Sequence, residues 1–571
     1  MSVAPIEYPP PVEPEKEFVG GLTDAEDERI EVGVAIVGGG PAGLATAVRL
    51  MQLLENEPEL TEKLGEVPVA VLEKGKTAGA HLLSGANMRP SAMLELFPAL
   101  EPSEWDFAYQ EVTDDAVYLL TKNRALPLVP MPPNFKNHGN YVISVAQLGR
   151  FLAEKAEEMG VYILNETVGD KLLVEDGIVR GVRSGDRGRG REGEELSNFE
   201  PGSDVVAKAT VLAEGTLAHL TRASLDYFDL HGPQPQRWEL GVKEVWEVPK
   251  PLTKVLHTMG WPLRKAAKYN EFGGSFIYPM GEDKLCIGMV IGLDYTDATV
   301  SCHDLLQEFK THPFVKDLIE GGKRVAWGAK TIPSGGYYAM PASLTVPGMC
   351  IAGDGAGMVD IPRLKGVHHA MHAGMMAAES IVEALKSDSI NFESYNEKFA
   401  ASQTANEIYK SRNMRQPFSK GFFLGGAMAS AMTITQGAFP GGEWDQEDDA
   451  EHEMFLGKGA DSYPEPDGEL TFDKLSSVFL SGNATRDDAP NHIRVQKEVP
   501  LEIAQTWVAM CPAQVYEIPE DQLEAAQSNG NGTKVDVSIT ASNCVQCGAI
   551  TAKGGRLTMP EGGDGPLYTE V

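Results

Sequence analysis

The chain of 571 residues is long enough for several domain-sized units, and 42% of its residues are hydrophobic, which excludes a disordered or fibrous protein. Acidic residues outnumber basic ones by 82 to 49, so the formal net charge is -33. Such a field repels phosphate backbones and excludes nucleic acid as a partner. Six cysteines are too few for a disulfide framework, which indicates a reducing compartment.

The sequence shows no run of the ~20 apolar residues that a membrane-spanning helix needs. Residues 1–30 are rich in proline and glutamate, so we expect neither a signal peptide nor a mitochondrial presequence on this chain. Residues 421–434 form an uncharged segment that follows Arg412, Arg415 and Lys420. Its length fits either a buried helix or a segment lying in a membrane interface.

The first elements form a nucleotide-binding pattern. An apolar strand at residues 32–37 leads into a glycine-rich turn, a helix follows at 44–54, and a second strand at 67–72 ends at Glu73. Gly38, Gly40 and Gly43 give the G-x-G-x-x-G spacing that permits a tight turn, a close approach to a pyrophosphate and helix-on-strand packing. Glu73 is expected to accept hydrogen bonds from the adenosine ribose.

The remaining pattern predicts further α/β units and an antiparallel sheet. We expect a helix at 147–159, two or three strands within 161–182, a hairpin or excursion at 185–203 and a strand at 205–213. An antiparallel sheet is expected over 238–294, a strand at 349–352, a helix at 367–385 and a linker at 444–466.

A second contact point for a dinucleotide lies far along the chain. Gly353 and Asp354 follow a strand, and Gly366 with Val367 begins the next helix. Asp354 suits the hydroxyl groups of a ribityl chain, and the helix N-terminus suits the pyrimidine oxygen of a flavin, so the pattern favours FAD over NAD. No acid–base or nucleophilic catalytic residue is needed, because the cofactors carry the chemistry.

Several short blocks together resemble one family. They are AGAHLLSG at 78–85, GWP at 260–262, FGGSF at 272–276, GLDY at 292–295, EGGKR at 320–324, KGVH at 365–368 and DGELTFDKL at 467–475. In this order they closely resemble electron transfer flavoprotein:ubiquinone oxidoreductases over nearly the whole chain. The resemblance implies electron transfer from reduced electron transfer flavoprotein through FAD to ubiquinone or menaquinone. The alternative is an FAD-dependent geranylgeranyl or prenyl reductase.

The resemblance also implies a domain plan in the α/β and α+β classes. We expect an acidic, proline-rich extension at 1–30, a glutathione-reductase-like FAD domain at 31–235 and 325–395, an antiparallel quinone-binding domain at 236–324, a helical membrane-associating segment with linker at 396–466, and a ferredoxin-like iron–sulfur domain at 467–571. FAD is expected to contact Lys74 and Gly85 as well, and the quinone head group to contact the backbone of Gly273 and Gly274.

By the same resemblance the protein is monotopic, with membrane-dipping segments near 87–108 and 417–436. An acidic body is repelled by anionic lipids, so Arg412, Arg415 and Lys420 are expected to assist attachment. The expected location is the cytoplasmic face of a prokaryotic inner membrane, or the matrix face of the mitochondrial inner membrane in a eukaryote.

Two positions depart from the family pattern. Cys511, Cys544 and Cys547 stand where cluster ligands are expected, but the fourth position is Ile550. A [4Fe-4S] cluster with a non-cysteine ligand, a [3Fe-4S] cluster, a zinc site and a metal-free domain all stay open. Val367 stands where the family has a threonine, which removes a hydroxyl group near the flavin.

Overall fold

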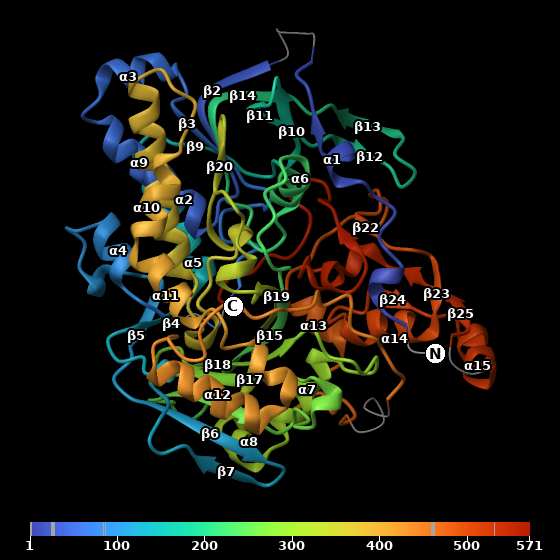
Figure 1. The fold of residues 1–571 in the computed structure, drawn as a ribbon. Helices are drawn as coiled ribbons and strands as arrows, with labels where there is room; N and C mark the ends of the chain where they lie inside the picture. Colours follow the sequence, from blue (N-terminus) through green and yellow to red (C-terminus); the bar gives the residue numbers. More distant parts are fainter. Residues whose placement is uncertain (1–2, 24–28, 84, 86, 458–462, 530–531) are drawn as a thin grey trace.

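The structure is a computed structural model and describes residues 3–23, 29–83, 85, 87–457, 463–529 and 532–571. Parts of the predicted extension, at 24–28, and of the predicted linker, at 458–462, lie outside the described residues. Figure 1 shows two large sheets, with helices clustered beside the first and the C-terminal region lying against both. The mixed α/β fold predicted from the sequence is confirmed.

The first sheet has nine strands and carries the predicted βαβ unit. Its main order is β1-β10-β11-β14-β2-β3-β9, and β21 pairs with β14 and β20. The strands are β1 (Val19–Gly20), β2 (Arg29–Val37), β3 (Val69–Leu72), β9 (Tyr162–Leu164), β10 (Gly169–Glu175), β11 (Ile178–Ser184), β14 (Asp204–Leu212), β20 (Thr345–Val346) and β21 (Met349–Ile351). β2 runs parallel to β3 and β14, and all four residues of β3 are buried, as in the interior of a parallel sheet.

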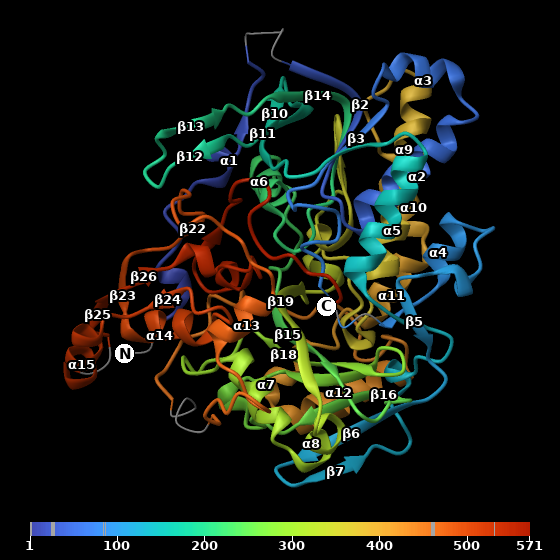
Figure 2. The ribbon, with the colours of Figure 1, turned by 180° about the vertical axis from the view of Figure 1, so that it is seen from behind.

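Long helices cover one face of this sheet. α2 (Pro41–Leu54), α5 (Val145–Glu158) and α9 (Val367–Lys386) lie together there in both views (Figures 1 and 2). α2 begins with Pro41 at its first position, where the fixed φ of proline favours a helix start. The carboxyl ends of β2 and β21 therefore meet the beginnings of α2 and α9, the position at which α/β folds bind ligands.

The second sheet is antiparallel over most of its seven strands, in the order β19-β15-β18-β17-β16-β6-β7. Its strands are β15 (Trp238–Glu247), β16 (Val255–Gly260), β17 (Gly273–Pro279), β18 (Lys284–Gly292), β19 (Lys323–Pro333), β6 (Asp115–Thr121) and β7 (Arg124–Pro127). β6 and β7 precede the predicted range of this domain by more than 100 residues and join the sheet through parallel pairing with β16. Long-range pairing of this kind has no local sequence signal.

Smaller elements complete the body. They are α1 (Pro14–Glu17), α3 (Pro58–Leu64), β4 (Asn87–Met88), α4 (Ser91–Leu96), β5 (Ala108–Glu111), β8 (Tyr141–Ile143), β12 (Arg187–Arg189), β13 (Glu195–Glu200), α6 (His219–Tyr227), α7 (Cys302–Lys310) and α8 (Pro313–Ile319). Residues 87–108, expected at the membrane, are partly buried and partly exposed. Met93, Leu96, Trp105 and Phe107 are buried in the core of the first sheet, whereas Leu94 is 42% exposed, so insertion of this segment into a membrane stays a prediction.

The segment after α9 forms α10 (Ser394–Ala401), α11 (Gln403–Ser411) and α12 (Phe422–Ile434). Arg412 and Arg415, expected to meet lipid, are buried: Arg412 donates to the Gly437 carbonyl, and Arg415 is paired with Asp294 at 2.5 Å. Breaking a buried pair would leave an uncompensated charge, so these partners keep Arg412 and Arg415 inside. Of the three cations, only Lys420 is exposed. Within the described part of the chain, no helix combines the length and the apolar character needed to cross a bilayer.

The C-terminal region packs against the second sheet and the N-terminal segment. It contains α13 (Lys474–Leu480), β22 (Ile493–Arg494), β23 (Glu498–Pro500), α14 (Leu501–Met510), β24 (Tyr516–Glu517), α15 (Glu520–Asn529), β25 (Lys534–Asp536), β26 (Ser538–Ile539) and β27 (Arg556–Leu557). Its buried residues share one hydrophobic cluster with those of the second sheet. Figure 2 shows this region beside β19 and away from α2 and α9.

Candidate functional site

The glycine-rich turn after β2 opens onto a large cavity. Gly38 has φ +107°, and a Cβ there would lie 2.3 Å from the Ala213 carbonyl oxygen, so only glycine fits the turn. A Cβ at Gly43 would lie 2.0 Å from the Gly38 oxygen, which explains the close packing of α2 on β2. A Cβ at Gly40 would meet nothing closer than Leu82 at 3.7 Å, because Gly40 faces the cavity. The three glycines therefore have the positions that their spacing predicts.

Glu73 closes the end of β3 beside this turn. Its carboxylate accepts hydrogen bonds from the backbone N–H of Gly39 at 2.9 Å and of Gly75 at 2.6 Å. Burial raises the pKa of Glu73, while these donors and Lys74 act in the opposite direction. Glu73 thus fixes the turn from the protein side and also lines the cavity.

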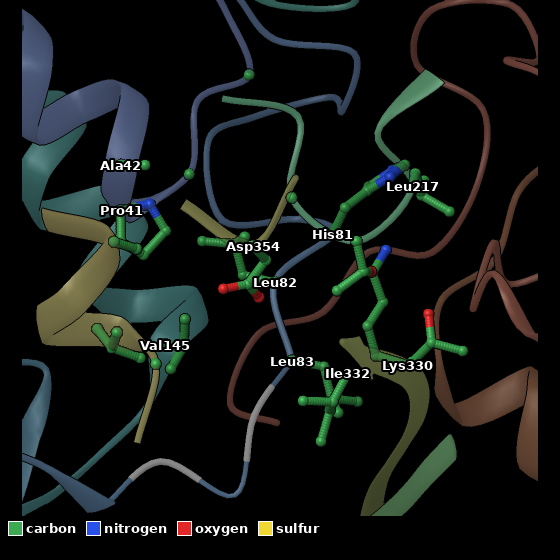
Figure 3. A pocket seen from close by; sticks show the side chains of 18 of the residues that line it. Pro41, Ala42, His81, Leu82, Leu83, Val145, Leu217, Lys330, Ile332 and Asp354 are labelled. Atoms are coloured by element: carbon green, nitrogen blue, oxygen red, sulfur yellow. The ribbon is translucent and has the colours of Figure 1, made fainter. Parts of the chain in front are cut away.

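The second predicted contact point lies on the same cavity. Asp354 follows β21, and Gly366 caps α9, whose first residue is Val367; all three line the cavity wall. Burial raises the pKa of Asp354 to about 6, with Lys330 acting to lower it. Gly353 has φ +77° and lies against Ala42, so it turns the chain rather than lining the cavity. In Figure 3, Pro41 and Asp354 stand on one side of the cavity, and Lys330 and His81 on the other.

Two polar side chains of the cavity wall lack hydrogen-bond partners within the described part of the chain. Both ring nitrogens of His81 and both side-chain polar atoms of Asn87 are buried with no hydrogen-bond partner among the described residues. Native proteins rarely leave such groups unsatisfied. A polar, elongated molecule such as FAD fits this wall, since one cavity joins the glycine turn, Asp354 and the start of α9.

β19 connects this cavity to the cysteine loop of the C-terminal region. Lys330 lines the cavity, and its Nζ donates to the backbone oxygen of Gln546 at 3.2 Å. The backbone N–H and Oγ1 of Thr331 donate to the oxygen of Cys547 at 2.9 and 2.8 Å. Lys74, on the other side, donates from Nζ to Oε1 of Gln546. Burial lowers the pKa of Lys74 to about 7 and that of Lys330 to about 8.

The three predicted cluster ligands lie in the same part of the C-terminal region. Burial raises the pKa of Tyr516, and the thiols of Cys511, Cys544 and Cys547 act in the same direction, so the three cysteines lie around this ring. Burial, followed by the Cys511 thiol, raises the pKa of Cys547 to about 12. Among the described residues the three sulfur atoms do not all lie within 4.8 Å of one another. Such a set of thiols in an apolar site fits an iron–sulfur cluster, whose positive irons favour the thiolate form. Ile550 is buried and contributes no ligand atom; a Cβ at Gly555 would lie 2.5 Å from its Cγ1.

The other predicted residues divide between the cavity wall and its surroundings. Gly85 and Lys74 line the cavity. Gly273 and Gly274 are on β17 outside the wall, but Val290, which pairs with Gly274, and Phe276 line it. Lys330, Thr331 and His81 were missed by the sequence reasoning. A lysine within an apolar, β-type run was the available signal for Lys330, and nothing local marked Thr331.

Comparisons with known proteins agree with this arrangement. Residues 238–332 match the family model "ETF-QO, ubiquinone-binding", and residues 468–569 match "Electron transfer flavoprotein-ubiquinone oxidoreductase, 4Fe-4S". The chain is 36% identical to an electron transfer flavoprotein-ubiquinone oxidoreductase of Pseudomonas aeruginosa, over 96% of this chain and all of that protein. It is 34% identical to the mitochondrial electron transfer flavoprotein-ubiquinone oxidoreductase of Caenorhabditis elegans, over 94% and 91% of the two chains.

Among solved structures, a geranylgeranyl bacteriochlorophyll reductase-like protein of Thermoplasma acidophilum shares the fold, with a TM-score of 0.54 and 17% identity over 72% of this chain and 96% of that one. This likeness concerns the fold alone, and the prenyl reductase alternative is not favoured. Fold and site define an FAD-dependent oxidoreductase that also carries an iron–sulfur cluster. The chain belongs to the electron transfer flavoprotein-ubiquinone oxidoreductase family.

Proposed function

We propose that this protein takes electrons from reduced electron transfer flavoprotein and delivers them to ubiquinone at the cavity between the two sheets. One observation carries the proposal: β19 lines the cavity through Lys330 and hydrogen-bonds the cysteine loop through Lys330 and Thr331. A single strand thus contacts both proposed cofactor sites, so they lie side by side.

The residues have distinct tasks in this account. FAD supplies one- and two-electron chemistry, and an iron–sulfur cluster supplies one-electron chemistry. Gly38, Gly40, Gly43, Glu73, Lys74, Gly85, Gly353, Asp354, Gly366 and Val367 hold or shape the FAD site. Cys511, Cys544 and Cys547 hold the cluster. Lys74 and Lys330 place positive charge between the two sites, which favours the reduced, more negative state of either.

The proposed quinone site is at β17 and β18. Pairing of β16 with β17 covers residues 275–277 and stops short of Gly274, while Val290, which pairs with Gly274, lines the cavity. A Cβ at Gly273 would lie 2.0 Å from the Val290 oxygen, and one at Gly274 would lie 2.6 Å from the Thr258 oxygen. Substitutions there would distort the sheet, so a test of the site needs a different residue.

Val290→Trp tests the quinone site without disturbing those glycines. Val290 is half-buried and lines the cavity, so an indole there fills the space for a head group. We expect ubiquinone reduction to fall by at least about tenfold, the effect of losing about 1.4 kcal/mol, while FAD content and reduction of FAD by dithionite stay normal.

Val325→Trp is the matched control, since Val325 is half-buried in the same sheet and does not line the cavity. Unchanged quinone kinetics in Val290→Trp, or equal losses in both variants, would place the quinone elsewhere.

We further propose that α12 attaches the protein to a membrane surface, on the cytoplasmic side in a prokaryote or the matrix side in a mitochondrion. Phe423, Leu424 and Ile434 expose 52–80% of their surface, although α12 carries no charge. The loop after β7 contacts α12, because Asn134 donates to Oγ1 of Thr433 at 2.8 Å, and Val129 of this loop is 85% exposed. An apolar surface of this kind suits insertion between lipid headgroups.

A further inference from the structure

The first turns of α9 carry an unusual group of histidines. His368, His369 and His372 make up three of the twelve histidines of the chain and lie within five residues. The binding of FAD, as assigned above, uses only the start of this helix and leaves the three side chains without a task.

His368 lies at the inner end of the group. It lines the cavity, and its Nε2 is buried and has no hydrogen-bond partner among the described residues. The same nitrogen lies 4.0 Å from Oε2 of Glu407, and Nε2 of His369 lies 3.6 Å from that oxygen. Two imidazoles thus face one carboxylate, and the carboxylate is 13% exposed to solvent.

His372 lies at the outer end. It is one helical turn beyond His368, with ring centroids 6.2 Å apart, and its side chain is 21% exposed. Its Nδ1 lies 3.2 Å from Oε2 of the exposed Glu95, and its Nε2 lies 3.2 Å from Oγ of Ser91. Titratable groups therefore continue from the cavity wall to the surface.

The surroundings favour protons over a metal ion. Arg89 donates from one nitrogen to both oxygens of Glu407 at 2.7 and 2.8 Å, and Gln403 donates to Oε1 at 2.7 Å. The charged groups around the cluster on the neighbouring elements are Arg89, Glu95, Asp360, Arg363 and Lys365. A carboxylate already held by a guanidinium is a poor ligand for a dication. Burial lowers the pKa of His368 to about 4, so the ring is neutral near pH 7 and offers both a donor and an acceptor nitrogen.

We propose that His368, Glu407 and His372 form a path that carries protons from solvent to quinone in the cavity. The inference rests on the proposed function: a quinone that takes two electrons must also take two protons, one on each carbonyl oxygen, to become the quinol. The electrons come from the reduced flavoprotein donor, and the protons come from water through this path. The 4.0 Å between Nε2 of His368 and Oε2 of Glu407 exceeds an ordinary hydrogen bond by about 1 Å, which a small side-chain rotation closes. The ring centroids of His368 and His372 are 6.2 Å apart, so the step to His372 requires an intervening water.

The test compares two electron acceptors with reduced electron transfer flavoprotein as donor. A short-chain ubiquinone needs protons, whereas the ferricenium ion takes one electron and no proton. His368→Gln should slow ubiquinone reduction by at least about tenfold, raise its H2O/D2O rate ratio and leave ferricenium reduction within about twofold. His372 does not line the cavity, so His372→Gln should slow ubiquinone reduction less than His368→Gln does. Added imidazole should restore part of the ubiquinone reduction rate in both variants.

His231→Gln is the control, because His231 is 58% exposed and paired with Asp226 on the surface. Equal slowing of both acceptors would show that His368 only positions the flavin, and unchanged ubiquinone rates in both variants would refute the path. A stoichiometric divalent metal in the purified protein that is lost in His369→Thr would refute it in favour of a metal site. A wild-type protein that reduces ferricenium but not ubiquinone would refute the proposed function, and the path with it.

Discussion

Ile550 is the residue at which this chain departs most from the ligand set of its family. Its side chain is buried against Gly555 in the core of the C-terminal region. The neighbouring thiols are kept: Cys511 follows α14, and Cys544 and Cys547 flank Gln546, which receives hydrogen bonds from both Lys74 and Lys330. The three thiols and their hydrogen-bonded surroundings are therefore present although one expected ligand position is aliphatic.

We predict that Ile550→Cys converts a labile, three-cysteine cluster into a stable [4Fe-4S] cluster. A fourth thiolate completes the coordination of the remaining iron and protects it from oxygen and chelators. Iron and sulfide content together with EPR spectra, measured on anaerobically purified protein before and after exposure to air, check this result.

Val499→Cys serves as the control, since Val499 is a buried aliphatic residue on β23 of the same region. Four irons per chain and full stability to air in the native protein would contradict the prediction, because a strong fourth ligand would then already be present.

At the scale of elements, the sequence predicted those helices and strands that depend on neighbouring residues alone. The βαβ unit, the strand before Asp354 and α9 follow from apolar runs, glycine spacing and helix periodicity, and the structure has all of them. The pairing of β6 with β16, and of Arg415 with Asp294 across 121 positions, depends on tertiary contacts that no short window contains. The same limit hid Thr331, whose role is visible only once the cysteine loop lies beside β19.

For α12, we predict that replacing Phe423, Leu424 and Ile434 by serine releases the protein from lipid vesicles without unfolding it. All three side chains are exposed, so the core loses nothing, while each buried apolar side chain contributes roughly 1.5–3 kcal/mol in a lipid interface. Vesicle co-sedimentation should show at least about a tenfold weaker partition.

Phe479→Ser provides the comparison, because Phe479 is 83% exposed on α13 in the C-terminal region. If the triple variant aggregates or loses FAD while the wild type stays in solution without lipid, then α12 is an ordinary packed helix.

At the scale of the whole molecule, buried neutral histidines link stability to pH. Burial lowers the pKa to about 3 for His219, His257 and His492 and to about 4 for His303 and His368. Between the ordinary value of 6.5 and pH 4 the unfolded chain binds more protons than the folded chain. The contribution of these histidines to the free energy of unfolding is therefore fully present above pH 6.5 and is lost as the pH falls.

We predict that His492→Phe reduces the loss of unfolding free energy at acid pH. His492 is buried, and neither ring nitrogen has a hydrogen-bond partner in the part of the chain that the structure describes, so phenylalanine replaces it closely. At pH 5 the variant should gain about 2 kcal/mol of unfolding free energy relative to its difference from wild type at pH 7.5. Denaturant titrations at the two pH values measure it, and an equal difference at both would show that His492 does not titrate on unfolding.

The most direct test follows electrons through the protein in two separate steps, reduction by the donor and reoxidation by the quinone. Reduced electron transfer flavoprotein is mixed anaerobically with the protein, and the flavin absorbance and the EPR spectrum are recorded before and after ubiquinone is added. The account predicts that both the flavin and the iron–sulfur cluster become reduced, and that ubiquinone reoxidises both. A flavin that stays oxidised beside the reduced donor, or stays reduced after ubiquinone is added, would contradict it.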